Sequence, residues 1–214
     1  MLIYAAADIH GRPARLEQIA SNIALFRPDV LIAAGDLAGL WRPRRVVEAL
    51  GRLPVPVLAV RGNSDPRAME GWLARTSGID SLHLKKIEFG GRSFVGAGGT
   101  IPVPFHSRLG FWESRIVKRL APLLAENSVF AAHPPPWGTL DRVGGRFHAG
   151  CRNLTALIKD KTPRVFICGH IHEAAGSFLL DRTLVVNCSM GRGGGGALIE
   201  LGPDGRSRVE MLAG

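Results

Sequence analysis

Five short apolar runs, each followed at once by a turn that carries Asp, Asn or His, most constrain what this chain can fold into. Each run has the length of a β-strand and is apolar throughout, as expected of a strand buried on both faces. Helical periodicity follows the first run from Pro13 to Phe26 and the second from Pro43 to Leu50. Such alternation is typical of an α/β sheet with parallel strands. The runs are Leu2–Ala7, Val30–Ala34, Val55–Val60, Ser128–Ala132 and Val165–Cys168.

The middle and the end of the chain have a different pattern. Ser81–Glu88 and Arg92–Ala97 flank Gly90-Gly91 and predict a hairpin, and residues 107–125 predict an amphipathic helix. A glycine-rich stretch, Gly191–Gly196, predicts a flexible turn or a lid that flanks the substrate. After His172 we expect four antiparallel strands separated by Asp, Gly and Pro turns, namely Gly176–Leu180, Thr183–Asn187, Gly196–Leu201 and Arg206–Leu212.

The composition limits the class of protein. With 214 residues, 46% of them hydrophobic, the chain is long enough for one cored domain and short for two, so we expect a single domain over residues 1–214. No apolar stretch reaches the roughly 18 residues of a membrane span. The first residues lack a basic segment and lead directly to Asp8, which predicts a cytoplasmic protein. Three cysteines without a C-x-x-C pair exclude a disulfide framework and a zinc ribbon.

The charge favours anionic ligands. The net charge is +9, from 27 Lys and Arg against 18 Asp and Glu, and such a balance attracts phosphate esters, nucleotides and nucleic acid. The arginines are scattered, and no basic stripe is interleaved with aromatic residues, as nucleic-acid binding would favour. We therefore expect a small phosphate-ester substrate, such as a nucleotide, with nucleic acid as the less favoured alternative. The sequence indicates no oligomeric state.

Polar side chains gather at the strand ends, where ligands bind in open α/β sheets. Taken singly, Asp8 and Asp36 also fit helix caps and Asn63 fits a turn, but the coincidence at five strand ends favours one site. Carboxylate, amide and imidazole groups without thiolates suit Mn, Fe, Zn, Ni or Co. The set is too large for one tetrahedral ion and fits two divalent ions that share a bridging carboxylate. Its members are Asp8, His10, Asp36, Asn63, His133, His170 and His172.

The same residues, with their neighbours, resemble a known family. The motifs match those of the calcineurin-like metallophosphoesterase superfamily, and the segments after His133 and Gly169 are similar to a phosphodiesterase-like branch. The resemblance implies a four-layer α/β/β/α sandwich of two mixed β-sheets flanked by helices. It also implies that Asp8, His10 and His172 hold one ion and that Asn63, His133 and His170 hold the second, with Asp36 bridging. The motifs, in chain order, are Asp8-x-His10, Gly35-Asp36, Gly62-Asn63-x-Asp65, His133 and Gly169-His170-x-His172.

One position departs from the family pattern. Many superfamily members have histidine after Gly-Asn, assigned to protonating the leaving group or to binding phosphate, and this chain has Ser64. A serine hydroxyl donates a hydrogen bond but is a poor general acid near neutral pH. The change disfavours efficient hydrolysis of alkyl phosphomonoesters. His148 and His106 are alternative proton donors.

We therefore predict a binuclear metal-dependent phosphoesterase, most consistent with a phosphodiesterase for nucleotide-like or other small diesters, in which a hydroxide shared by the ions attacks phosphorus. Asp65 would orient a histidine ligand or the loop. The alternatives are a phosphomonoesterase or nucleotide pyrophosphohydrolase and, from another class, a metal-binding interaction module with little turnover. Trp137 and Phe147 are candidates for stacking on a nucleobase. The predicted catalytic residues are Asp36, Asn63 and His133, and the predicted substrate contacts are Asn63, Arg61, Ser64 and Arg12.

Overall fold

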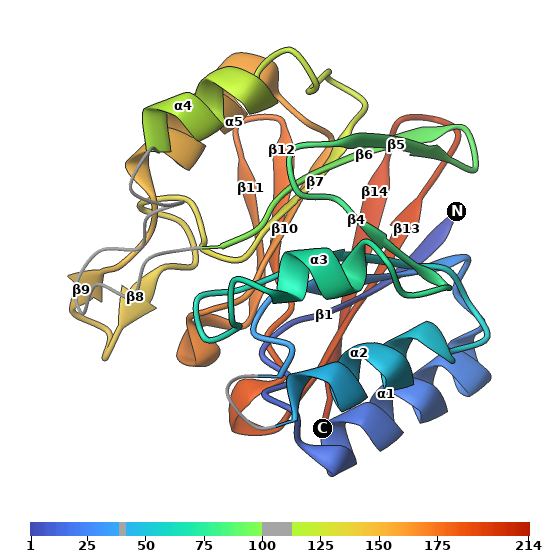
Figure 1. The fold of residues 1–214 in the computed structure, drawn as a ribbon. Coiled ribbons are helices and arrows are strands. Elements are labelled where there is room, and N and C mark those ends of the chain that lie inside the picture. The colour runs from blue at the N-terminus through green and yellow to red at the C-terminus, as the bar shows by residue number, and fades with distance from the viewer. Residues whose placement is uncertain (39–41, 100–112) are drawn as a thin grey trace.

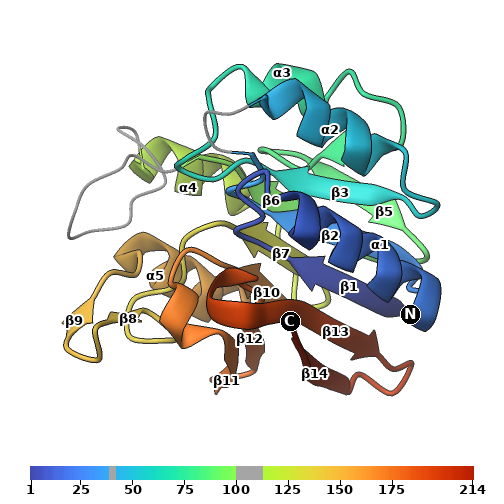
Figure 2. The same ribbon diagram turned by 90° about the horizontal axis from the view of Figure 1, so that it is seen from below.

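Two mixed β-sheets face each other in the computed structural model, which describes residues 1–38, 42–99 and 113–214 (Figure 1, Figure 2). The first sheet contains, in spatial order, β14 (Ser207–Ala213), β13 (Gly194–Leu201), β1 (Leu2–Ala6), β2 (Val30–Ala34), β3 (Val57–Val60) and β4 (Ile79–Ser81). The second contains β11 (Gly176–Leu180), β12 (Thr183–Asn187), β10 (Val165–Cys168), β7 (Val129–Ala132), β6 (Arg92–Ala97) and β5 (Lys86–Phe89).

Each sheet has a parallel centre. In the first sheet β1, β2, β3 and β4 are parallel, while β13 and β14 continue the sheet with antiparallel pairing. In the second sheet β6, β7, β10 and β12 are parallel, and the antiparallel strands β5 and β11 form its two edges. Parallel strands end at the same edge, so the turns that follow them are brought together.

Helices cover the outer face of both sheets. The first sheet packs against α1 (Pro13–Phe26), α2 (Pro43–Gly51) and α3 (Met69–Leu73), and the second packs against α4 (Glu113–Leu120) and α5 (Arg152–Lys161). Alternation along β1 shows the layering, because Ile3 and Ala5 lie between the sheets while Tyr4 and Ala6 lie against the helices. The predicted four-layer α/β/β/α sandwich is confirmed. Within the described ranges, no helix is both long enough and apolar enough to cross a membrane.

Several local predictions need correction. The expected strand Ser81–Glu88 is divided: the antiparallel pairing with β6 begins at Lys86 and is preceded by a single parallel bridge between His83 and Gly96, while Ile79–Ser81 belongs to the first sheet and pairs with β3. Thr183–Asn187 is antiparallel to β11 as expected, but it is parallel to β10 on its other side. The glycine-rich stretch begins with a 3-10 turn, η2 (Gly191–Gly193), and then continues into β13. Residues 100–112, which include His106 and the start of the predicted helix, lie outside the described residues.

The layer between the second sheet and its helices provides a test of the packing. Phe130 and Phe166 are fully buried there, and their rings meet edge to face with centroids 5.1 Å apart. We expect Phe166→Ala to lower the free energy of unfolding by about 3–5 kcal/mol, because it leaves a cavity in a close-packed layer. Urea unfolding followed by circular dichroism measures the change. Phe178→Ala in β11, where the ring is 54% exposed, is the matched control, and an equal loss in both variants would contradict this packing.

Candidate metal centre

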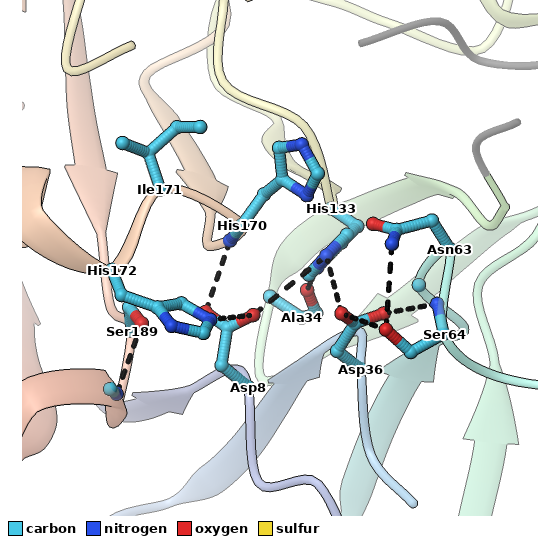
Figure 3. A network of polar contacts seen from close by, with 12 residues as sticks. Asp8, Ala34, Asp36, Asn63, Ser64, His133, His170, Ile171, His172 and Ser189 are labelled. Atoms are coloured by element: carbon cyan, nitrogen blue, oxygen red, sulfur yellow. Dashed lines mark hydrogen bonds and ion pairs between the residues drawn. The ribbon is translucent and has the colours of Figure 1, made fainter. Parts of the chain in front are cut away.

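The ends of parallel strands from both sheets meet at one edge of the molecule, and the polar side chains lie there (Figure 3). Main-chain hydrogen bonds fix the turns to one another. Asp8 N donates to Gly35 O at 3.0 Å and His10 N donates to Asp36 O at 2.9 Å, which joins the turns after β1 and β2. Gly169 N donates to His133 O at 3.0 Å, which joins the turns after β10 and β7. The fold thus positions residues that are far apart in the sequence.

A first group of side chains surrounds one carboxylate oxygen. His172 Nε2 lies 3.3 Å from Asp8 Oδ1, and His10 Nε2 lies 4.0 Å from the same oxygen. The three ligand atoms lie within 4.8 Å of one another, as the donors around one ion must. His172 opens η1 (His172–Ala174), a 3-10 turn that directs its ring back toward Asp8. These are the three residues that the resemblance assigns to one ion.

A second group lies beside the first. His133 Nε2 is 3.4 Å from Asp36 Oδ2 and 3.8 Å from Asp8 Oδ1, and the three residues form a fully buried set. His10 Nε2 is also 3.9 Å from Asp36 Oδ2. Both carboxylates therefore lie between the two groups, so a bridging position is open to Asp8 as well as to Asp36. The ring of His170 packs against that of His133 with centroids 5.2 Å apart.

Three buried atoms in this region lack a hydrogen-bond partner among the residues that the structure describes. They are Asp8 Oδ1, Asn63 Oδ1 and His133 Nε2. His133 Nδ1 lies 2.9 Å from Ala34 O, a carbonyl that can only accept, so Nδ1 carries the proton and Nε2 offers its lone pair in the neutral ring. A carboxylate oxygen, an amide oxygen and an imidazole nitrogen without partners are costly in a protein interior and are the donors a divalent cation needs. The residues present fit a metal centre.

The electrostatics of the site favour cations. Burial raises the pKa of Asp8 and of Asp36, but contacts with His172 and His133 for Asp8, and with His133 and Ser64 for Asp36, outweigh it, so both pKa values lie below the ordinary range. Burial lowers the pKa of His133, yet the charge of Asp36 and Asp8 raises it to about 10. A field that binds a proton this firmly at His133 Nε2 also attracts a divalent ion. Burial lowers the pKa of His170 to about 4, so this ring is neutral and able to act as a ligand near neutral pH.

The backbone at the site is strained. Asp8, His10, Asp36 and His170 all adopt left-handed conformations, with φ of 60°, 51°, 51° and 72°. Such conformations cost about 1 kcal/mol or more each for residues other than glycine, and they are retained where function needs the side-chain direction. Neither Asp8 nor Asp36 caps a helix, since α1 and α2 begin at caps without side-chain hydrogen bonds. The capping alternative for the two carboxylates is therefore wrong.

Ser64 and Asp65 join the turn after β3 to the turn after β2. Ser64 Oγ donates to Asp36 Oδ2 at 2.8 Å, and Ser64 N donates to Asp36 Oδ1 at 2.8 Å. Asp65 is buried and accepts hydrogen bonds from Leu37 N, Ala38 N and Gly62 N at 2.9–3.0 Å. It thus orients the loop, which is one of the two roles predicted for it. The hydroxyl proton of Ser64 is used on Asp36, and the contact of Ser64 with substrate stays a prediction.

The two arginines predicted to contact substrate have other surroundings. Arg61 Nε lies 3.4 Å from Glu70 Oε1, and Arg61 Nη1 donates to Gly62 O at 3.4 Å, so this side chain is engaged beside the β3 turn. Arg12 is exposed at the start of α1. Neither is among the residues whose side chains surround the two carboxylates.

Three residues that support the site were missed by sequence reasoning. Arg15, in the first turn of α1, donates to the main-chain oxygen of Asp8. The side chain of Ser189 hydrogen-bonds to Asp8 and contributes to its low pKa. Asn187 Nδ2 donates to Ile171 O at 2.9 Å and holds the turn between the two histidines. Asn187 is the last residue of β12 and Ser189 follows it, so the polar residues at this sixth strand end were the available signal.

Gly62 provides a test of the carboxylate position. A Cβ at Gly62 would lie 2.0 Å from Asp36 Oδ1 and 2.3 Å from Asp36 N, so Gly62→Ala must displace Asp36. We expect the affinity for Mn²⁺ to fall roughly tenfold or more, measured by isothermal titration calorimetry. Gly71→Ala in α3 is the control, because the nearest atom to the new Cβ is the flexible end of Arg75. Equal affinity in wild type and Gly62→Ala would contradict a role for Asp36 in ion binding.

Several solved structures of other proteins are similar to this fold. The protein TT1561 of Thermus thermophilus is similar over 98% of both chains, with a TM-score of 0.72 at 18% identity. A dimetal phosphatase from Danio rerio aligns over 100% of this chain and 96% of its own, with a TM-score of 0.68 at 14% identity. A novel archaeal phosphodiesterase aligns over 99% of this chain and 100% of its own, with a TM-score of 0.57 at 17% identity. At these identities the likeness shows a shared fold.

Sequence comparison defines the family. None of the curated proteins matches the chain by sequence. The model of the calcineurin-like phosphoesterases matches residues 1–174, which include every predicted ligand and most of both sheets. The chain therefore belongs to the calcineurin-like phosphoesterase family and is a metallophosphoesterase, a hydrolase that acts on phosphate esters.

Proposed function

We propose that the chain is a binuclear metal-dependent phosphodiesterase for nucleotide-like or other small diesters. The observation that carries the proposal is the set of three buried atoms without hydrogen-bond partners in the described part of the chain, Asp8 Oδ1, Asn63 Oδ1 and His133 Nε2. They lie among seven side chains of the types that hold divalent ions. Manganese as the ion, a cytoplasmic location and a single domain over residues 1–214 remain predictions from the sequence.

The ligands divide between the two groups described above. In this proposal Asp8, His10 and His172 hold one ion, and Asn63, His133 and His170 hold the other, with Asp36 between them. Two ions in such a centre supply an activated water as nucleophile and neutralise charge on the phosphoryl oxygens. His133 must present Nε2 without a proton, and the hydrogen bond between Nδ1 and Ala34 O favours that tautomer.

The oxygen and the nitrogen of the Asn63 side-chain amide can bind different partners. Its Oδ1 is buried and directed into the site, while its Nδ2 lies 3.4 Å from Ser64 Oγ, a long contact that leaves donor capacity on the amide. The amide can therefore hold an ion through oxygen and donate to a phosphoryl oxygen through nitrogen. Asp65 fixes the turn in which Asn63 sits, because it binds main-chain N–H groups from both neighbouring turns.

The chemistry of Ser64 disfavours efficient hydrolysis of alkyl phosphomonoesters. Its hydroxyl donates to Asp36 at 2.8 Å, so no side chain at this position protonates a leaving group. Esters with acidic leaving groups depend less on such a donor. The same feature favours the second candidate function, an interaction module that keeps the ions and has little turnover.

A panel assay tests the proposal. Purified protein with Mn²⁺, Ni²⁺, Co²⁺, Zn²⁺ or Mg²⁺ is expected to hydrolyse bis(p-nitrophenyl) phosphate faster than p-nitrophenyl phosphate. Asp36→Asn and Asn63→Ala should each lower kcat by about 100-fold or more, since even residues that support metal ligands contribute ~10- to 100-fold in affinity or activity.

Asp80→Asn is the matched control for these variants, because Asp80 is an exposed residue of β4 outside the centre. Turnover that persists in Asp36→Asn would indicate a contaminating enzyme. Two bound ions per chain without turnover of any ester would overturn the phosphodiesterase and favour the interaction module.

Ser64→His tests the reason given for the diester preference. We expect a roughly tenfold or greater rise in hydrolysis of an alkyl phosphomonoester such as glycerol 2-phosphate, because a general acid typically contributes ~100-fold or more. Ser64→Ala is the control, since it also loses the hydrogen bond to Asp36 but adds no acid. If both variants change monoester hydrolysis equally, the missing acid is not what limits it.

A further inference from the structure

A hairpin outside the metal centre carries exposed side chains that are not among the candidate metal ligands. β8 (Arg142–Val143) and β9 (Phe147–His148) form a two-stranded antiparallel ribbon that projects from the body of the molecule, drawn in yellow in Figure 1. Arg142 pairs with His148, and Val143 pairs with Phe147. Short isolated ribbons are marginally stable in water, so this one must be held by contacts with the rest of the chain.

A buried carboxylate holds the base of the hairpin. Asp141 is 1% exposed, and its Oδ2 accepts hydrogen bonds from Gly138 N and Gly150 N, both at 3.0 Å. Its Oδ1 lies 2.7 Å from His148 Nδ1. The His148 ring packs on Trp137 with centroids 5.3 Å apart. Trp137 follows His133 by four residues, so the base of the hairpin is fixed to a segment that carries a candidate ligand.

The tip of the hairpin is fixed to another such segment. Gly144 N donates to Glu173 Oε1 at 2.7 Å, and Glu173 is the neighbour of His172 in η1. β8 also lies against η1. The hairpin therefore connects the segment after His133 with the segment that carries His172, so it is attached to two segments that supply candidate ligands.

One face of the β8–β9 hairpin is apolar and exposed. His148 uses the opposite face to pack on Trp137, so Val143 and Phe147 share the free face as a cross-strand pair. The Phe147 side chain is 68% exposed and Val143 is 41% exposed. A large aromatic ring on a fixed hairpin, next to an apolar neighbour, is a platform for a planar group.

The charge around this pair favours an anion. Arg142 and Arg146 are exposed on the hairpin, and Arg192 of η2 lies 4.0 Å from Glu173 with its side chain 69% exposed. These exposed arginines, of which Arg142 lies on the His148 face of the ribbon, make the hairpin and its surroundings basic and favour an anionic ligand that carries a planar base. A nucleoside phosphate has this chemistry, and a purely apolar partner does not.

We propose that the β8–β9 hairpin is the subsite for the nucleoside substituent of the diester, with the base stacked on Phe147 and the phosphate at the metal centre, while the exposed arginines of the hairpin attract the anionic substrate. This inference rests on the proposed function and names its substrate class. The metal centre acts on the phosphorus atom, and the hairpin selects the esters that carry a base.

Two substrates with the same leaving group isolate the contribution of the hairpin. Thymidine 5′-(p-nitrophenyl phosphate) and methyl p-nitrophenyl phosphate both release p-nitrophenolate, and only the first carries a base. We expect wild type to prefer the thymidine ester. Phe147→Ser should lower kcat/KM for the thymidine ester roughly tenfold or more, as loss of a stacked base does, and leave the methyl ester within about twofold.

The controls separate this inference from the proposed function. Phe178→Ser removes an exposed ring from β11 and should leave both substrates unchanged. Val143→Ser should reproduce a smaller share of the Phe147→Ser effect, and thermal unfolding checks that each variant is folded. Equal loss on both esters, or no loss on either, would overturn the nucleoside subsite while methyl ester turnover still supports the phosphodiesterase. A wild-type protein inactive on both esters would overturn both.

Discussion

The structure depends on two buried carboxylates that lie beside each other at the edge where the two sheets meet. Asp8 and Asp36 are 0% and 3% exposed, and both are held as anions. A buried anion costs several kcal/mol unless cations or hydrogen-bond donors surround it. Histidines from three turns and the Ser64 hydroxyl supply part of this compensation, and Asp8 Oδ1 still has no hydrogen-bond donor within the described segments. Divalent ions are the partners that complete it.

The surrounding backbone is shaped to permit this arrangement. Left-handed residues at Asp8, His10, Asp36 and His170 turn side chains toward a common point, at a cost in conformational energy. Gly62 and Gly169 bring the main chain close to the carboxylates, since a Cβ on Gly169 would lie 2.7 Å from Asp8 Oδ2. A chain selected only for stability would not retain this combination of strain and buried charge. The site therefore explains sequence features that the fold alone does not require.

Much of this centre could be predicted, because strand ends and short motifs are local in sequence. The apolar runs locate β1, β2, β7 and β10, and parallel pairing brings their ends to one edge. Interactions between distant segments could not be read in the same way. The parallel pairing of β12 with β10 and the placement of β4 in the first sheet depend on which neighbour a strand meets after a crossover. The same holds for Asp65, whose carboxylate binds N–H groups of Leu37 and Ala38 some 27 residues away.

Ser64 affects which parts of the protein can discriminate between phosphate esters. In the family pattern a histidine at this position acts at the phosphoryl group, whereas here the side chain is turned onto Asp36 and supports a ligand instead. Ions polarise any phosphate ester in much the same way, so discrimination between esters has to come from groups that contact the substituents. The β8–β9 hairpin is fixed to the segments of His133 and His172, while its aromatic face has no role in the core. The proposed phosphodiesterase activity and the proposed nucleoside subsite are therefore consistent with each other, because a centre without an acid at position 64 would leave the choice of substrate to the hairpin.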